Sequence, residues 1–383
     1  MGKLVGIAFL LALWPASLLA QSVAWHWEDV GSPTPKAVKL QHAATVDGAR
    51  FLHSAPPSDD KVKAIAQMHN GAMVFGARSG LYILKERVLE RFMGTRYARG
   101  GDRHLAGNSP LSPGGVQALA VGEDGALWVG TGSGLFRISG GKWTLLKARS
   151  PVPTGGSSFL GLARELSDIQ ELLLRSDGKI IAGSRCAGVT LIDPALRTAR
   201  TVFHNEDENN WVEGIAEDRS RVLWVGVKGL GVLRYDGQVT NLYKHEPWIP
   251  GADIRAICVD RSGALWVASH QGLGVRSAAG TSRVFTTPFP LPDNNVWNLC
   301  VRRNGQVWAN TSMGLVVFDG QEWFCAKADG LPRCCCGGPL FEAADGSFWV
   351  GGHPGVVRNP TFSMTKLQPQ RDGVQRERVP RDP

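Results

Sequence analysis

The fold is decided by one stretch, Asp124-Gly125-Ala126-Leu127-Trp128-Val129-Gly130-Thr131-Gly132-Ser133-Gly134-Leu135-Phe136. Asp-Gly ahead of an apolar run indicates a tight hairpin turn, because glycine accepts the positive φ that such a turn requires. The continuous apolar residues at 127–129 are typical of a strand covered on both faces. The glycines that follow turn the chain again, so residues 135–138 can pair antiparallel with this strand. The stretch therefore predicts turn, strand, turn and strand.

The same phrase recurs down most of the 383 residues. We call its central position the anchor, and seven residues occupy it: Val74, Trp128, Ile181, Trp224, Trp266, Trp308 and Trp349. Four of the six spacings between successive anchors are about 41–43 residues, which is the length of one four-stranded propeller blade. The two longer spacings contain polar insertions rich in glycine and proline. The sequence therefore predicts an all-β protein, a seven-bladed β-propeller of four-stranded antiparallel blades.

The position eight residues before each anchor is apolar and mostly small, as expected for a crowded inner strand. Its occupants are Ala66, Ala120, Leu173, Ala216, Cys258, Cys300 and Phe341. The last unit has little strand-like sequence after Arg358, whereas residues 23–27 are strand-like and precede the first unit. We expect this N-terminal strand to pair into the last blade and close the ring, because closure removes two open sheet edges.

The repeated phrase resembles the two-component regulator propeller repeat, through the pattern Asp-Gly-x-Leu-Trp-Val-Gly-Thr-x-x-Gly-Leu at 124–135. Residues 291–296 (Leu-Pro-Asp-Asn-Asn-Val) also look like the family's segment that leads into the next blade. The resemblance covers roughly Lys61 to Arg358. It implies a ligand-binding, sensor-like propeller of the kind found outside the cytoplasm in hybrid histidine kinases. Because the sequence contains no kinase or receiver segment, we expect no kinase output.

The N-terminus is typical of a secretory signal peptide, with Lys3 ahead of an apolar run from Leu4 to Trp14 that is too short to span a membrane comfortably. We expect a signal peptide at 1–22, the propeller at 23–366 and a disordered polar tail at 367–383, in a periplasmic or extracellular protein. The net charge is +8. Export makes nucleic acid an unsuitable partner, so the charge indicates either attraction to acidic polysaccharide or simply a solvated basic surface.

Propellers usually bind ligands on the face that carries the loops between second and third strands. Polar side chains in those loops, our candidate ligand-binding residues, are Arg78, Arg185, Lys228, His270, Gln271 and His353. Cationic and imidazole groups around one channel mouth suit an anionic or sugar-like ligand. The alternative is that these side chains only face water.

Catalytic motifs such as Gly-x-Ser-x-Gly, His-Glu-x-x-His or a P-loop do not occur in the sequence, and we expect no cofactor and no metal. Two alternatives to ligand binding remain open. One is a polysaccharide or small-molecule lyase or hydrolase, with His204, His245, His270 and His353 as candidates. The other is a scaffold that binds a protein partner around Trp211 and Trp248.

Six of the seven cysteines fall into two groups. Cys258 and Cys300 occupy inner-strand positions and are expected to be small buried hydrophobic residues. Cys325 precedes the adjacent cysteines at 334–336, and a disulfide between Cys325 and one of them is compatible with export.

Overall fold

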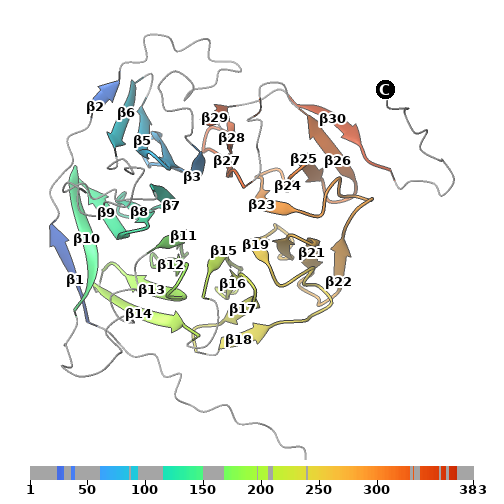
Figure 1. Cartoon of the computed structure of the whole chain (residues 1–383), viewed down its shortest axis with the longest axis horizontal. Coiled ribbons are helices and arrows are strands. Elements are labelled where there is room, and N and C mark those ends of the chain that lie inside the picture. Colours follow the sequence, from blue (N-terminus) through green and yellow to red (C-terminus); the bar gives the residue numbers. More distant parts are fainter. Residues whose placement is uncertain are drawn as a thin grey trace, which may run out of the picture.

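The computed structural model describes residues 24–29, 36–38, 61–85, 88–93, 115–149, 168–195, 197–205, 210–238, 240–327, 331, 337–352, 355–358 and 362–368. These residues form 30 strands and no helix, arranged as seven antiparallel sheets around a central channel (Figure 1). The protein is a seven-bladed β-propeller, as the repeats predict. The predicted signal peptide at 1–22 and most of the predicted tail lie outside the described residues.

Each blade follows the order of the sequence, from an inner strand at the channel to an outer strand at the rim. The first three blades are β3 (Val62–Gln67), β4 (Met73–Ala77), β5 (Gly80–Lys85) and β6 (Val88–Met93); β7 (Val116–Val121), β8 (Leu127–Thr131), β9 (Gly134–Ser139) and β10 (Lys142–Arg149); and β11 (Ile169–Leu174), β12 (Ile180–Ser184), β13 (Val189–Asp193) and β14 (Thr198–Phe203).

The next three blades have the same composition. They are β15 (Val212–Glu217), β16 (Leu223–Val227), β17 (Gly231–Tyr235) and β18 (Thr240–Tyr243); β19 (Ile254–Val259), β20 (Leu265–Ser269), β21 (Gly272–Arg276) and β22 (Ser282–Phe285); and β23 (Val296–Val301), β24 (Val307–Thr311), β25 (Gly314–Phe318) and β26 (Trp323–Lys327). The seventh blade has three strands among the described residues, β27 (Leu340–Glu342), β28 (Phe348–Gly352) and β29 (Gly355–Arg358).

The prediction that the N-terminal strand closes the ring is wrong. The strand β1 (Ala24–Asp29) pairs antiparallel with β10, on the outer edge of the second blade. Every blade offers such an edge, and β10, with 8 residues, is the longest strand and offers the longest row of partners. Two further short strands extend other blades in the same way: β2 (Lys36–Val38) pairs with β6, and β30 (Ser363–Lys366) pairs with β26.

The ring closes by side-chain packing between the seventh and first blades. Trp349 of β28 contacts Phe75 of β4, with ring centroids 5.3 Å apart, and Val62 and Ala343 pack in the same cluster. The backbone N–H of Ala344 also donates a hydrogen bond to Gln67 on β3. Burial of this apolar surface joins the two ends of the ring without exchange of a strand.

The anchor and the inner-strand position pair directly in every blade. Ala66 lies opposite Val74, Cys258 opposite Trp266 and Phe341 opposite Trp349. All seven anchors are buried or nearly so. The indole N–H of Trp266 donates to the Asp260 carboxylate at 2.8 Å, and that carboxylate also accepts backbone N–H groups of the leading turn. Asp218 does the same for Trp224 in the fourth blade, so in these two blades one turn residue satisfies both the turn and the buried indole.

The glycine two residues after the anchor lets neighbouring blades approach closely. A Cβ added to Gly130 would lie 2.6 Å from Cγ2 of Ile169, which opens the inner strand of the next blade. Gly76 lies against Val116 in the same way, and Gly183 against Val212. The repeated glycine is therefore a packing requirement rather than a ligand-binding motif.

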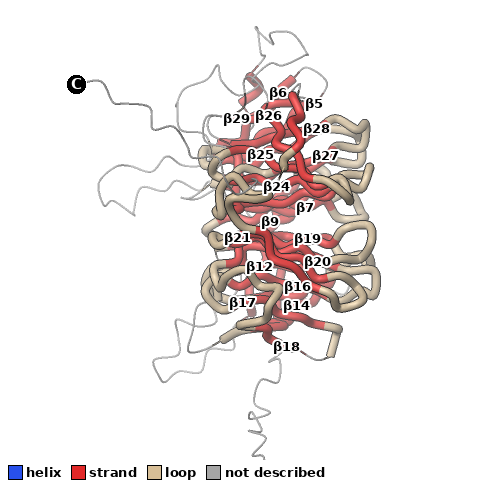
Figure 2. Tube along the Cα trace, turned by 90° about the vertical axis from the view of Figure 1, so that its right-hand side faces the viewer, coloured by secondary structure: helices blue, strands red, loops and turns tan. Residues whose placement is uncertain are grey.

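In side view the strands lie between two opposite faces of loops (Figure 2). Turns between first and second strands lie on one face, and turns between second and third strands lie on the other, since the blade strands alternate in direction. The candidate ligand-binding residues belong to the second kind of turn. Membrane-spanning helices are absent from the described part of the chain.

Candidate functional site

Six inner strands carry the same irregularity at the channel. In β3, β7, β11, β15, β19 and β23 the register with the second strand shifts between the first and third residues. Such a β-bulge leaves the intervening residue outside the ladder and re-aims its side chain. The intervening residues are Lys63, Gln117, Gln170, Glu213, Arg255 and Trp297. The repeated bulge therefore places a polar or amphipathic residue from each of six blades at one end of the channel.

A cavity of about 210 Å³ lies among these strands in the channel. Its polar lining comprises Lys63, Gln117, Glu171, Glu213, Arg255 and Asn298. Small residues such as Ala64, Ala118 and Gly214 line the same space and leave room between the polar side chains. Six blades therefore contribute hydrogen-bonding groups to one small volume.

Two carboxyl groups in this cavity have raised pKa values. Burial, and then the charge of Glu213, raise the pKa of Glu171 to about 8. Burial also raises the pKa of Glu213, although the Arg255 guanidinium opposes the effect. At neutral pH Glu171 is therefore predominantly a neutral acid, which donates a hydrogen bond as well as accepting one.

Arg255 is the centre of a charged network at the channel mouth. Its Nη1 lies 2.7 Å from Glu213 Oε2, and its Nη2 lies 3.1 Å from Asp253 Oδ2. Its Nε–H donates to Nε2 of His270 at 2.7 Å. The His270 Nδ1 lies 3.1 Å from Asp253 Oδ2. Both ring nitrogens of His270 are therefore engaged, and burial followed by the charge of Arg255 lowers its pKa, which favours the neutral imidazole.

Aromatic rings extend this network along the mouth. The His270 ring packs edge-on against Trp297 with centroids 5.0 Å apart, and the indole N–H of Trp297 donates to Ser312. In the neighbouring blade, Trp211 lies between two cations. Cζ of Arg185 is 4.0 Å from the Trp211 ring centroid, and Nζ of Lys228 is 3.9 Å from it. Cation–π attraction holds both charges at the mouth.

The two groups of residues are connected through Asp253. The Lys228 ammonium lies 3.9 Å from Asp253 Oδ1, while Asp253 Oδ2 contacts His270 and Arg255. Three of the predicted site residues, Arg185, Lys228 and His270, therefore meet in one continuous cluster. We call this cluster, with the cavity beneath it, the mouth site.

The other predicted site residues are Arg78, Gln271 and His353. Arg78 is near enough for its charge, like those of Lys61 and Arg185, to add to the effect of burial in lowering the pKa of Lys63. Gln271 is exposed, lies against Gly251, and donates its backbone N–H to Ser269. His353 lies outside the described residues.

The four histidines proposed for catalysis do not form one group. His204 and His245 make no hydrogen bond or ring contact with His270 in the described part of the chain, and His353 lies outside it. His270 itself has no free ring nitrogen to act as a base. The geometry therefore gives no support to histidine catalysis.

Sequence reasoning missed the residues of the cavity, including Lys63, Glu213 and Arg255. A signal for them exists. Each bulge residue lies eleven positions before its anchor, and all except Trp297 have charged or amide side chains in a strand that is otherwise largely apolar. Glu171 has no such signal, because the equivalent positions are mostly occupied by alanine or glycine.

The cysteines provide no metal site in the described residues, which hold no cluster of three or more His, Cys, Asp and Glu side chains able to bind an ion. Cys258 and Cys300 pack against the core, and burial raises the pKa of Cys300 to about 12. Cys325 is a free thiol, and its predicted partners at 334–336 lie outside the described residues.

Comparison with known proteins finds relatives in fold only. The sequence matches no family model and no curated protein. A catalytically inactive virginiamycin B lyase from Staphylococcus aureus with quinupristin matches at TM-score 0.56 and 11% identity, over 82% of this chain and 97% of that chain. The WD40 β-propeller domain of Doa1 matches at TM-score 0.53 and 13% identity, over 83% of this chain and 97% of that chain.

The extracellular domain of the putative hybrid two component system BT3049 from B. thetaiotaomicron is also similar, with a TM-score of 0.46 and 14% identity. The match covers 78% of this chain and 56% of the BT3049 chain. The matched proteins thus include an enzyme, a WD40 domain and an extracellular domain of a putative hybrid two component system. At these identities the likenesses establish the β-propeller fold and leave the function to the site.

Proposed function

We propose that this protein is an exported, non-catalytic β-propeller that binds a small anionic, hydroxyl-rich ligand at the mouth site. The chemical class that fits best is an acidic saccharide. The role resembles that of the extracytoplasmic sensor propellers of two-component regulators. The signal peptide expected from the sequence supports export.

The observation that carries this proposal is the clustering of cations and aromatic rings over a polar cavity. Lys63, Arg185, Lys228 and Arg255 face this region, whereas the carboxyl groups paired within the cluster are Glu213 and Asp253. The excess of positive charge, in a site walled by low-dielectric protein, attracts an anion. Because Glu171 is largely neutral at pH 7, it adds a donor rather than a repelling charge.

The size of the cavity limits the part of the ligand that enters it. A volume of about 210 Å³ is below the ~300–1,000 Å³ of pockets that enclose drug-sized ligands. A cavity of this volume suits a single sugar residue or a comparably small acid. Amide and carboxyl groups from several blades suit the hydroxyls of such a ligand.

The test is a glycan array that contains matched neutral and acidic saccharides, followed by calorimetry on the strongest hit. We expect binding to acidic members. The Arg185→Glu variant should weaken it at least about tenfold, since it reverses one charge at the mouth. Arg261→Glu, a matched charge reversal on the opposite loop face, should leave binding unchanged. Absence of any acidic ligand, or equal effects of the two variants, would refute the proposal.

The Glu171–Glu213 pair also favours a second candidate, a lyase or hydrolase acting on an acidic polysaccharide or small molecule. Two carboxyl groups in different environments commonly serve as the general acid and the general base of an enzyme. Here Glu171 would be the acid, and Glu213, paired with Arg255, the base. Incubation with the acidic glycans that bind, followed by mass spectrometry, tests this. Intact glycans after prolonged incubation would exclude catalysis on those substrates.

A further inference from the structure

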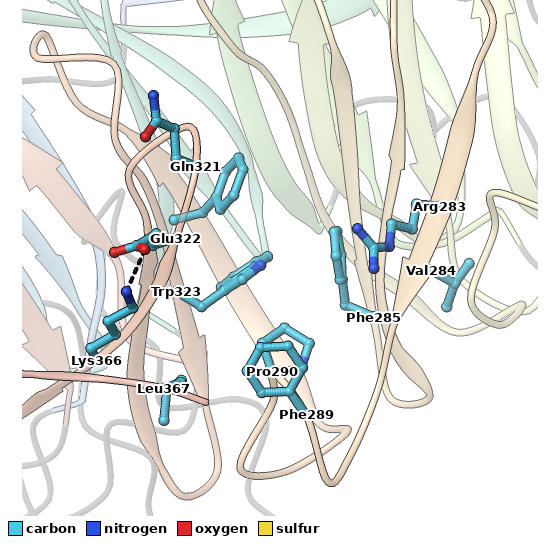
Figure 3. A pocket seen from close by; sticks show the side chains of 11 residues that line it. Arg283, Val284, Phe285, Phe289, Pro290, Gln321, Glu322, Trp323, Lys366 and Leu367 are labelled. Atoms are coloured by element: carbon cyan, nitrogen blue, oxygen red, sulfur yellow. Dashed lines mark hydrogen bonds and ion pairs between the residues drawn. The ribbon is translucent and has the colours of Figure 1, made fainter. Parts of the chain in front are cut away.

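A second cavity lies at the rim of the propeller, far from the channel in the ring, between the outer parts of the fifth and sixth blades (Figure 3). Its volume is about 370 Å³. Its apolar lining includes Phe285 of β22, Trp323 of β26, and Phe289 and Pro290 from the loop between the blades. The rings of Phe285 and Trp323 lie 4.9 Å apart, so the floor is a packed aromatic surface. We call this cavity the rim groove.

The charges around the rim groove are unequal. On the wall formed by the sixth blade, Lys366 forms an ion pair with Glu322, so the two charges offset each other. On the opposite wall, the guanidinium of Arg283 lies over the Phe285 ring, with Cζ 5.2 Å from the centroid. Arg283 is exposed and has no carboxylate partner among the described residues. The groove therefore carries one uncompensated positive charge next to an aromatic floor.

The strand beside the groove also has an open edge. β22 pairs with β21 on its inner side and has no partner on its outer side in the described part of the chain. In three other blades the equivalent edge is covered by an extended segment of the chain, because β2, β1 and β30 add to the first, second and sixth blades. Antiparallel strand addition is thus the way in which this protein already occupies its outer edges.

We propose that the outer edge of β22 binds an extended segment of a partner protein as an added antiparallel strand. The segment carries an apolar side chain that fills the rim groove, and an acidic side chain two residues later that pairs with Arg283. Main-chain hydrogen bonds to the edge supply affinity, and the two side chains supply specificity.

The spacing of the two side chains follows from the geometry of the sheet. Arg283 and Phe285 are two residues apart on β22, so their side chains leave the same face, the one toward the sixth blade. Residues of an added strand opposite them point to that face as well. In an antiparallel strand, the residue opposite Phe285 comes first and the residue opposite Arg283 comes two positions later. The predicted pattern is apolar, any residue, acidic.

The test uses a fluorescein-labelled peptide, Ser-Thr-Leu-Thr-Glu-Thr-Ser, and fluorescence anisotropy with the full chain. A control peptide of the same composition places Leu and Glu next to each other, which sends them to opposite faces. We expect saturable binding of the first peptide and binding at least about tenfold weaker for the control. Equal binding of the two peptides, or no saturable binding of either, overturns the proposal.

Protein variants locate the peptide. Arg283→Glu should weaken binding about tenfold, and a peptide with Lys in place of Glu should recover it. The matched control is Asn241→Glu, at the equivalent position of β18 in the fourth blade, which should change nothing. A chain ending at Gln368 should bind as the full chain does. Tighter binding by this shorter chain would make residues 369–383 the natural occupant and overturn the assignment to a partner.

Discussion

Replacing Glu171 by Gln tests the electrostatics of the channel most directly. The carboxyl has a pKa of about 8 in the folded protein, against 4.5 ordinarily, because it is buried and lies near Glu213. Between these two pH values the folded protein holds a proton that the unfolded chain has released. Wild-type stability therefore falls as pH rises from about 4.5 to about 8, and stays lower above that range. Gln cannot ionise, so the variant lacks this loss.

The size of the effect follows from the two pKa values. Their difference corresponds to about 5 kcal/mol when it is expressed fully. The side chain lines the channel and is half-buried, so solvent screens part of the interaction, and we expect about 2 kcal/mol. The variant should match the wild type within about 1 kcal/mol at pH 4.5 and exceed its free energy of unfolding by about 2 kcal/mol at pH 9.

Urea unfolding at pH 4.5, 7 and 9 measures this difference. Glu246→Gln provides the control, because the same exchange is made at an exposed residue in the loop between β18 and β19 and removes no buried carboxyl group. A stability difference between Glu171→Gln and the wild type that does not change from pH 4.5 to pH 9 would show that Glu171 titrates normally. The affinity for an acidic ligand at the mouth site should also fall as pH rises through about 8, since Glu171 then adds a negative charge.

Two further substitutions test the mouth network and the packing of the blades. Arg255→Met should lower the free energy of unfolding by about 2–3 kcal/mol, because Glu213 is left half-buried without its partner. The control, Arg261→Met on an exposed turn, should change the free energy of unfolding by less than about 0.5 kcal/mol. Gly274→Ala should cost about 1–3 kcal/mol, since its Cβ would overlap the backbone oxygen of Trp248. Urea midpoints measure both, and an unchanged midpoint for either would contradict the contact on which it rests.

The repeat predicts the blades well because each blade is a local unit. Turn chemistry, the anchor and the residue opposite it lie within about a dozen residues, so the register of Ala66 with Val74 can be inferred from the spacing alone. The position of the N-terminal strand cannot be inferred in this way. A strand pattern at 23–27 identifies a strand, whereas the choice among seven similar outer edges depends on their lengths and on the path of the chain. Here β1 pairs with β10, the longest of the described strands.

The mouth site shows the corresponding limit for function. Loop position predicted that Arg185, Lys228 and His270 would face one mouth, and they meet there. Residue type was a poorer guide to role. An imidazole in a loop suggests an available base, yet both nitrogens of His270 are engaged by Asp253 and Arg255.

Four of the six polar side chains that line the cavity come instead from a bulge repeated in six inner strands, and a bulge depends on the pairing of two strands rather than on any one residue. Its trace in the sequence is a polar residue eleven positions before an anchor, as at Lys63, Glu213 and Arg255. In a propeller of this kind, the differences among blades that matter for binding therefore lie on the inner strand as much as in the loops. Comparison of that single position among related propellers should group them by ligand charge, and a lack of such grouping would argue that the loops alone select the ligand.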